Sequence, residues 1–358
     1  MGVSLKPTME QLLRQLVEQG ATDLHLTGNQ PPHLRVDDRL VATDHASLSG
    51  DDVKELAYSL ISPERVERFE RWKELDFAFS VEGLARFRAN YFIQQGYVGA
   101  AIRMLPFRIL NFNELGLQPQ LVTDLIEKPK GLVLVTGATG SGKTTTLAAM
   151  VDYLNSSKDF HIITIEDPIE YLHTSRRSII DQREVGDDTQ SFAQGLKHVL
   201  RQDPDVILIG EMRDLETIET ALIVAETGHL VLATLHTSDA VQTINRIVDV
   251  FPAHQQNQVR VQLSMELLGV ISQQLVPKAS GRGRALAAEV LVVNHAVRSL
   301  VREQKIHQMY SVMQTGQKEG MRTMNQSLYD LYVNRVIGLE EALARSSDPE
   351  DLKRLMTR

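Results

Sequence analysis

The sequence contains no cysteine, and only one of its 358 residues is a tryptophan. Without cysteine the chain can form no disulfide and no cysteine-ligated zinc site, which agrees with a cytoplasmic protein. No run approaches the roughly 18 consecutive apolar residues expected of a transmembrane helix. The N-terminal MGVSLKPTMEQ also lacks the apolar stretch of a signal peptide. The formal net charge of -8 argues against a general nucleic-acid-binding protein.

The composition is that of an ordinary globular protein, and the length predicts two domains. The first hundred residues indicate a small α+β domain. Thr8 and Gln11 form a capping-box pattern for a helix that ends at Gly20. Short alternating strands are expected at 23–26, 33–36 and 39–42, with a turn at Asp37-Asp38, and period-two patterns follow from 75 to 105. The segment 105–120, with two prolines and two asparagines, is predicted to be a linker.

Four short apolar runs follow, separated by helical patterns: GLVLVTG (131–137), FHIITIED (160–167), DVILIGE (205–211) and HLVLATLHT (229–237). Continuous apolar strands that alternate with helices indicate a parallel sheet covered on both faces. Helices are expected around 215–225 and 241–251, and another from Asp348-Pro349. The chain beyond about Gln255 is predicted to be helix-rich.

The first apolar run ends in a full match to GxxxxGK[ST], between a predicted strand and a predicted helix. Its residues are Gly137, Ala138, Thr139, Gly140, Ser141, Gly142, Lys143 and Thr144, with Thr145 following. Such a loop wraps phosphates with backbone N–H groups at a helix N-terminus. Lys143 is expected to reach the β- and γ-phosphates, and the Thr144 hydroxyl is expected to bind Mg²⁺. The alternative, a glycine-rich turn that matches by accident, is disfavoured by the strand and helix around it.

The second and third runs end in carboxylates. Glu166, Asp167 and Glu170 lie within five residues, and one of them could orient and deprotonate an attacking water. The alternative is an Asp167-Pro168 turn with solvated glutamates. In the third run Gly210 stands near the place where an aspartate usually holds magnesium, and Glu211 follows it. Glu211 could bind Mg²⁺ through water; otherwise it is a surface residue that ends a strand.

The fourth run opens with His229 and closes with His236. Seven residues of strand separate these side chains by roughly 23 Å, too far for one shared metal. His236 lies where a γ-phosphate sensor would be. A histidine that is hydrogen-bonded for structural reasons remains the competing interpretation.

Together GATGSGKTTT, ITIEDPIEYLH, RQDPDVILIGEMRD and TGHLVLATLHT resemble the Walker A, Asp box, Walker B and His box of the type II/IV secretion ATPases. The whole chain is similar to the type IV pilus retraction ATPases, the PilT family. The likeness includes TDLHL (22–26), RFRANYF (86–92), AIRMLP (101–106), QREVGDDTQSF (182–192), HTSDAVQTINRIVDVFP (236–252), ISQQLVPK (271–278) and TMNQSLYDL (323–331).

This resemblance implies an α/β fold with a RecA-like P-loop ATPase core at 113–358 and a smaller α+β PAS-like N-terminal domain at 1–112. It also implies ATP and Mg²⁺ as cofactors. Residue by residue, it implies Glu170 as general base with Glu166 nearby, Glu211 acting through magnesium, and Arg88 and Arg103 reaching the γ-phosphate.

The alternation of residues 86–91 supports a row of arginines on one face of a strand. Arg86, Arg88 and Asn90 share that face, opposite Phe87, Ala89 and Tyr91. Such a row could also be simply solvated.

The function implied by the resemblance is a homohexameric, Mg-dependent ATPase motor that drives pilus retraction and twitching motility. It would act within the pilus machinery through a PilC-like inner-membrane platform protein. It would be cytoplasmic, peripherally associated with the inner membrane at the pilus base, without a transmembrane segment and without a nucleic-acid partner.

Several alternatives stay open. The retraction signature AIRNLIRE appears here as AVRSLVRE (296–303), with Ser299 in place of asparagine, so an accessory retraction paralogue is an alternative. An assembly or secretion ATPase is another, although those usually carry a four-cysteine insertion that this sequence lacks. A nucleic-acid motor and a poorly hydrolysing regulatory subunit are less compatible with the charge and with the intact motifs.

Overall fold

The computed structural model describes residues 6–37, 39–105 and 108–357. Asp38 of the expected turn and residues 106–107 of the expected linker lie outside this described part. The chain divides into two compact units. The first unit comprises the chain up to Arg108 together with Pro168–Leu172, and the second comprises Ile109–Asp167 and the chain from His173 onward.

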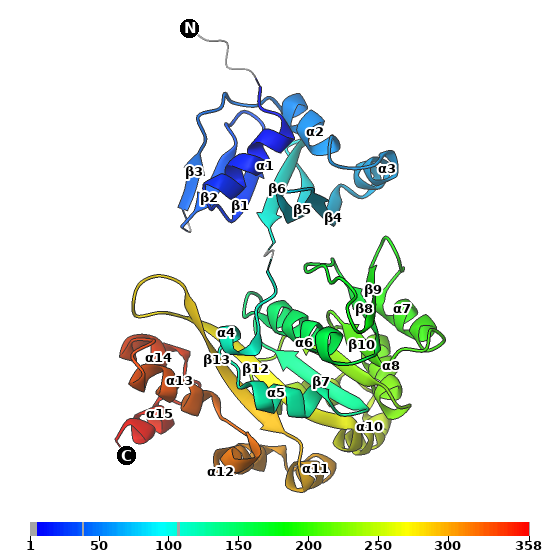
Figure 1. The fold of residues 1–358 in the computed structure, drawn as a ribbon, viewed down its shortest axis with the longest axis vertical. Helices are drawn as coiled ribbons and strands as arrows, with labels where there is room; N and C mark the ends of the chain where they lie inside the picture. Colours follow the sequence, from blue (N-terminus) through cyan, green and yellow to red (C-terminus); the bar gives the residue numbers. More distant parts are fainter. Residues whose placement is uncertain (1–5, 38, 106–107, 358) are drawn as a thin grey trace. The chain divides into compact units, whose positions relative to one another are not determined.

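The first unit is built on one antiparallel sheet in the order β3-β2-β1-β6-β5-β4 (Figure 1). Its strands are β1 (Asp23–Leu26), β2 (His33–Val36), β3 (Arg39–Ala42), β4 (Glu74–Val81), β5 (Ala85–Gln94) and β6 (Tyr97–Met104). Its helices are α1 (Met9–Glu18), α2 (Gly50–Tyr58) and α3 (Pro63–Trp72). The expected first helix and the expected strands are confirmed.

Local signals and burial explain these elements. At the start of α1 the Thr8 hydroxyl accepts the N–H of Gln11 at 3.3 Å, and the Gln11 side chain accepts the N–H of Thr8 at 2.9 Å. Along β5, residues from Ala85 to Tyr91 alternate between buried and half-buried, so the arginines share the face opposite Phe87 and Tyr91. The buried face joins the three helices in one core.

The second unit contains a seven-stranded sheet in the order β13-β12-β7-β11-β10-β8-β9. Only the pair formed by β12 and β13 is antiparallel. The strands are β7 (Gly131–Thr136), β8 (His161–Glu166), β9 (Ile179–Glu184), β10 (Val206–Ile209), β11 (Leu230–Leu235), β12 (Leu267–Pro277) and β13 (Arg284–Val292). The four strands expected from apolar runs are confirmed, and they are the centre of the sheet.

Helices cover both faces of this sheet, as expected for buried parallel strands. One apolar core joins the sheet to α4 (Phe112–Leu115), α5 (Pro119–Ile126) and α6 (Lys143–Ser157). A second core joins the other face to α7 (Phe192–Val199), α8 (Leu215–Glu226), α9 (Ala240–Asp249), α10 (Ala253–Glu266), α11 (His295–Arg302) and α12 (Met309–Thr315). None of the described helices is both long and apolar enough to cross a membrane.

One expectation about secondary structure was wrong in part, and another was incomplete. The segment 105–120 contains α4, whose first turn is capped by the Asn111 side chain, and the start of α5. The chain beyond Gln255 is helix-rich as expected, but it also contains β12 and β13, which extend the sheet from β7 to its edge at β13. Helix α10 ends at Glu266 and β12 begins at the next residue without an intervening glycine or proline, so pairing with β7 determines the change.

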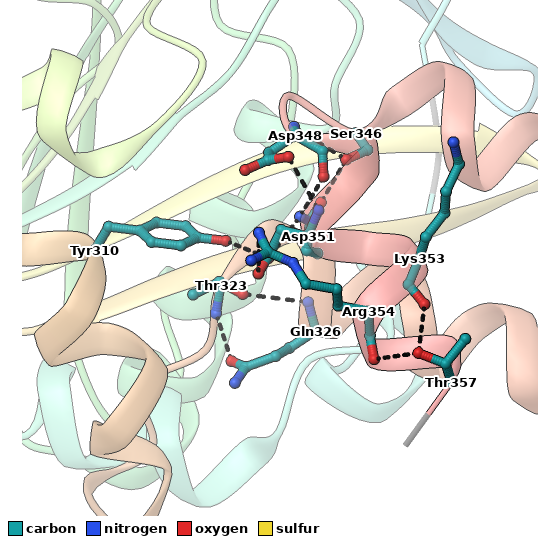
Figure 2. Close-up of polar contacts among 10 residues, drawn as sticks. Tyr310, Thr323, Gln326, Ser346, Asp348, Asp351, Lys353, Arg354 and Thr357 are labelled. Atoms are coloured by element: carbon teal, nitrogen blue, oxygen red, sulfur yellow. Dashed lines mark hydrogen bonds and ion pairs between the residues drawn. The ribbon is translucent and has the colours of Figure 1, made fainter.

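The C-terminal helices pack on the β12–β13 pair (Figure 1). They are α13 (Met324–Val333), α14 (Leu339–Arg345) and α15 (Pro349–Met356), and the short 3-10 turns η1 (Ile306–Gln308) and η2 (Gly316–Glu319) precede them. Asp348 caps α15, whose first residue is Pro349, as expected. Figure 2 shows polar contacts that join these helices, including the Tyr310 hydroxyl donating to Asp351 at 2.9 Å.

Candidate active site

The carboxyl ends of four neighbouring strands meet at one edge of the second unit's sheet. In the register of the ladders, Thr136 of β7 lies opposite Leu235 of β11. Ile209 of β10 lies between Ala233 of β11 and Ile165 of β8. The polar residues that follow these positions are therefore brought to the same edge, where open α/β sheets bind ligands.

The loop between β7 and α6 has the backbone of a phosphate-binding loop. Gly137, Gly140 and Gly142 have φ angles of 142°, 77° and 92°. Residues other than glycine rarely adopt a backbone conformation with such positive φ angles. A Cβ at Gly137 would lie 2.4 Å from the carbonyl oxygen of Gln273, so only glycine fits there. Gly142 is the N-cap of α6 and supplies no side-chain cap, which leaves the first turn of the helix open to an anion.

Two side chains of this loop are buried polar groups suited to a phosphate. Lys143 is 8% exposed, and its Nζ donates to the carbonyl oxygens of Gly137 and Ala138 at 2.9 and 3.0 Å. Ser141 is 5% exposed, and its Oγ has no hydrogen-bond partner among the described residues. Buried polar groups are nearly always satisfied, so an unpaired hydroxyl beside a buried ammonium fits a ligand with acceptor oxygens.

Strand β12 supports this loop from behind, a role that the sequence did not indicate. The Ser272 and Thr136 hydroxyls lie 2.8 Å apart, and the Gln273 amide donates to Thr146 of α6 at 2.7 Å. Ser272 and Gln273 are both buried. ISQQLVPK had been noted only for its resemblance, because no local pattern shows that these residues reach β7 and α6.

Glu166 ends β8 as a fixed, largely buried carboxylate. It accepts from the Thr164 hydroxyl at 2.6 Å and from the Gln182 amide at 3.1 Å. Its residue is 8% exposed. Because two donors orient the carboxylate, Glu166 is preorganised at the same edge as the phosphate loop. Thr164 and Gln182 were not among the predicted site residues; Gln182 comes from β9, which the sequence analysis did not recognise.

Glu170 lies in Pro168–Leu172, the segment that belongs to the first unit. Arg88 Nη1 is 3.7 Å from Glu170 Oε1 and Arg88 Nη2 is 3.7 Å from Asp76 Oδ1. Arg86 donates to the Ile169 carbonyl at 2.8 and 3.1 Å. Arg103 instead donates to Asp23 at 2.7 Å. The structure thus brings Arg88 and Glu170 together, while the roles assigned to Glu170, Arg88 and Arg103 stay predictions.

Glu211 and His236 are in direct contact at the ends of β10 and β11. His236 Nε2 lies 3.1 Å from Glu211 Oε1, and Arg213 Nε lies 2.6 Å from the same oxygen. Burial acts to raise the pKa of Glu211, but the hydrogen bond from Arg213 and the neighbouring His236 outweigh it and lower that pKa. Glu211 is therefore held as a carboxylate. Arg213 had not been singled out in the sequence.

Close packing of the strands explains why a glycine, Gly210, stands at the place where an aspartate is usual. A Cβ there would lie 3.3 Å from the backbone of Glu166 and 3.3 Å from the Ile165 carbonyl oxygen, a tight approach between β10 and β8. The Gly210 carbonyl accepts from the Thr234 hydroxyl at 2.6 Å. Gly210 thus lets the strand ends come close, and Glu211 supplies the carboxylate one residue later.

The oxygen donors at this edge are of the kind that Mg²⁺ prefers. The described residues include no group of three or more His, Asp or Glu side chains that could hold a metal ion. Thr144 and Glu211 offer one hydroxyl and one carboxylate, and Mg²⁺ is usually bound by one or two such groups together with phosphates and water. His229, at the other end of β11, contacts the Val224 carbonyl at 3.1 Å.

The doubly covered sheet and the phosphate loop at its strand ends define a P-loop ATPase of the α/β class. The chain belongs to the type II/IV secretion system protein family, whose model matches residues 4–344. It is 48% identical to the type IV pilus retraction ATPase PilT of Pseudomonas aeruginosa, over 95% of this chain and 98% of that protein. It is 42% identical to the type IV pilus ATPase PilU of the same organism, over 96% of this chain and 90% of that protein.

A solved structure has the same fold. The crystal structure of the pilus retraction motor PilT with bound ADP has a TM-score of 0.91 and 50% identity, and it covers 98% of this chain and 100% of that chain. The predicted fold class, a RecA-like P-loop ATPase core with a smaller α+β N-terminal domain, is confirmed by this likeness. The predicted ATPase activity is likewise supported by the family.

Proposed function

We propose that this protein is a Mg-dependent ATPase motor that powers type IV pilus retraction, and thereby twitching motility. The observation that carries the proposal is the set of four strand ends that bring the phosphate loop, Glu166, Glu211 and His236 to one edge of the sheet. Similarity to the PilT relative over nearly the full chain supports retraction as the task.

In this proposal each residue has a separate task toward ATP. The backbone of residues 137–145 and the Lys143 ammonium hold the phosphates, with Thr144 and Glu211 placed to hold Mg²⁺ directly or through water. The metal would neutralise charge on the phosphate oxygens. Glu170 is the proposed base for the attacking water, and Glu166 orients groups beside it. His236 would contact the γ-phosphate region, and its contact with Glu211 links those two strand ends.

The proposed assembly is a homohexamer in the cytoplasm, peripherally associated with the inner membrane at the pilus base. It would act on a PilC-like platform protein within the pilus machinery. Arg88 and Arg103 are proposed to contact the γ-phosphate. Arginines that reach a nucleotide from another domain or subunit couple its state to movement.

An accessory retraction ATPase is the second candidate, and the similarity to PilU over nearly the same length favours keeping it. Ser299 within AVRSLVRE is the sequence feature that raises this alternative. An assembly or secretion ATPase of the same family is a third candidate.

Deletion of the gene separates these candidates. Loss of twitching with an excess of surface pili is the expected result for the retraction motor. Loss of surface pili would instead indicate assembly. Near-normal motility that collapses only when a second retraction ATPase is weakened would indicate the accessory role. Purified protein should hydrolyse ATP in the presence of Mg²⁺. A lack of ATP hydrolysis under all conditions tested would contradict the proposed motor function.

A further inference from the structure

Glu289 is a buried carboxylate that the proposed chemistry does not use. It lies on β13 and is 4% exposed. Its register partner on β12 is Ser272, which in turn pairs with Thr136 at the end of β7. Glu289 is therefore level with the strand end from which the phosphate loop departs, two strands away.

The partners of Glu289 are the first N–H groups of two helices. One oxygen accepts the N–H of Ala240, the first residue of α9, at 2.9 Å. The other oxygen accepts the N–H of Met324, the first residue of α13, at 3.3 Å. First-turn N–H groups have no partner within their own helix, so this one side chain satisfies two helix starts at once.

Helix α9 is connected directly to the candidate active site. It begins four residues after His236, which contacts Glu211. The intervening segment is ordered by its own contacts, because the Thr237 and Thr243 hydroxyls lie 2.6 Å apart and Asp239 caps the helix. His236 and the start of α9 are therefore joined by a short, hydrogen-bonded stretch of chain.

The start of helix α13 is hydrogen-bonded to the start of α15, another of the C-terminal helices. Asn325, the residue after Met324, donates to the Asp348 carbonyl and to the Asp351 carboxylate, each at 2.9 Å. Asp351 also accepts from Tyr310, and Figure 2 shows Asp348, Asp351 and Tyr310 gathered around this point. The start of α13 is thus bonded to α15, and Asp351 of α15 is bonded in turn to Tyr310 of α12.

We propose that Glu289 is a positioning residue that joins the His236–α9 segment to the C-terminal helices, so that nucleotide state at the strand ends is transmitted to residues 323–357. This inference rests on the proposed ATP site, but it assigns a task to a residue outside that site. A carboxylate suits the task because it has two acceptor oxygens, one for each helix.

The surroundings of Glu289 agree with a carboxylate held by backbone donors alone. Burial and the neighbouring Asp239 raise the pKa of Glu289, the two N–H donors lower it, and the net result is a pKa of about 7. Tyr310 of α12 is the other titratable group that interacts with it. No lysine or arginine is among the partners recorded for Glu289 within the described chain.

The test is hydrogen–deuterium exchange of the full-length protein with and without ADP and MgCl₂. In wild type, ADP is expected to change exchange in residues 323–357. In Glu289→Gln, whose amide offers only one acceptor oxygen, that change should fall by at least about half while the affinity for ADP stays within about threefold. For ATP turnover, kcat should fall by about 2- to 30-fold with KM nearly unchanged.

The matched control is Glu266→Gln. Glu266 is likewise buried, at 8% exposed, and has a raised pKa, but its ion-pair partner is Lys130, at 3.9 Å. This variant should keep the wild-type exchange response. A wild-type response in Glu289→Gln, or no ADP-dependent change at 323–357 in wild type, would overturn the inference.

A second pair of variants tests the hydrogen bond from the Met324 N–H to Glu289 without altering Glu289. Met324→Ala shortens the side chain and keeps the N–H, whereas Met324→Pro removes the N–H. Proline is tolerated at the first position of a helix, and Thr323 before it is already extended, with ψ of 159°. Only the proline variant should lose the response, and equal behaviour of the two would contradict the role of this bond.

Failure of this inference is distinguishable from failure of the proposed function. An exchange response that depends on Glu289, in a protein without ATP turnover, would refute the motor and leave the inference standing. Turnover and motility with no role for Glu289 would do the reverse.

Discussion

Glu211 and Glu289 are two carboxylates of the same sheet whose surroundings change their pKa values in opposite directions. Burial acts on both, but Glu211 lies against Arg213 and His236, and its pKa is lowered. Within the described part of the chain the hydrogen-bond partners of Glu289 are backbone N–H groups, and its pKa is raised to about 7. The strand-end region, which comprises residues 137–145, Glu166, Glu211 and His236, keeps Glu211 negatively charged. In the β13 region, around Glu289, the carboxylate can hold a proton near neutral pH.

The two carboxylates therefore have different proposed tasks: Glu211 takes part in ATP hydrolysis, and Glu289 joins two helices. The proposed phosphate and metal chemistry needs fixed charges at the strand ends, where open α/β sheets bind their ligands. Joining two helices needs acceptor oxygens and little else. Each region can therefore be altered separately, and the expected effects below run from the largest to the smallest.

The largest expected effect comes from removing the buried ammonium group of the phosphate loop. Lys143→Ala should lower ATP turnover by about 100- to 1000-fold, because this ammonium is expected to compensate the negative charge of the phosphates. Steady-state phosphate release measures this. The C-terminal helices should keep their exchange protection without nucleotide, since the contacts of Glu289 are untouched.

Lys197→Ala is the control for this prediction. Lys197 is a half-exposed lysine paired with Glu216 on α7 and α8, away from the loop sequence. Its variant should hydrolyse ATP at close to the wild-type rate. Equal loss of turnover in both variants would mean that Lys143 acts through general stability rather than at the phosphates.

The next effect concerns stability and pH in the β13 region. The folded-state pKa of Glu289 is about 7, above the 4.5 of an ordinary glutamate, so the folded protein binds more protons than the unfolded chain between these values. Stability should therefore fall as pH rises from about 4.5 to 7, by up to about 3 kcal/mol from this group. Glu289→Gln should remove this part of the pH dependence.

Urea unfolding from pH 5 to 8 measures the difference between wild type and Glu289→Gln. The two stability curves should diverge with the wild type losing more as pH rises. Parallel curves would show that Glu289 does not carry a raised pKa, and would weaken the contrast with Glu211.

The sequence predicted the strand-end region well because its signals are local. The strands β7, β8, β10 and β11 are continuous apolar runs, and polar residues follow each of them directly. The loop at 137–144 needs glycines at fixed spacing, and the caps at Thr8 and Asp348 use residues three apart. Parallel pairing then brings the ends together without further information.

The β12–β13 region was not predicted because its signals are distant in the chain. Strand β12 follows α10 without a breaker, and the alanines of ALAAEVLV in β13 also suit a helix. The two helix starts that Glu289 joins are 49 and 35 residues away from it in sequence. No window along the sequence contains such a contact, so only the folded sheet reveals it.

A smaller effect is expected from the carboxylate of the strand-end region. Glu211→Gln should lower turnover by about 10- to 100-fold, the usual cost of losing a group that holds a metal through its water shell. The loss should be partly recovered at higher MgCl₂. Glu216→Gln, an exposed glutamate in the first turn of α8, is the control and should leave turnover unchanged.

Wild-type turnover in Glu211→Gln would require a different carboxylate to hold the metal. Glu166 would then be the next residue to test, because it ends the neighbouring strand β8 and is held by two donors. In that case the role of Glu211 would be limited to its ion pairs with Arg213 and His236.

The smallest effect is expected from Arg213→Gln. The Arg213 side chain is 75% exposed, and exposed ion pairs contribute little, so turnover should change by less than about threefold. His236 remains against the carboxylate after this substitution and should keep Glu211 in place. His236→Gln, assayed in parallel for phosphate release, should cost more, because it alters the end of β11 itself. If Arg213→Gln instead costs as much as Glu211→Gln, Arg213 is part of the phosphate site, and the strand-end region extends two residues beyond Glu211.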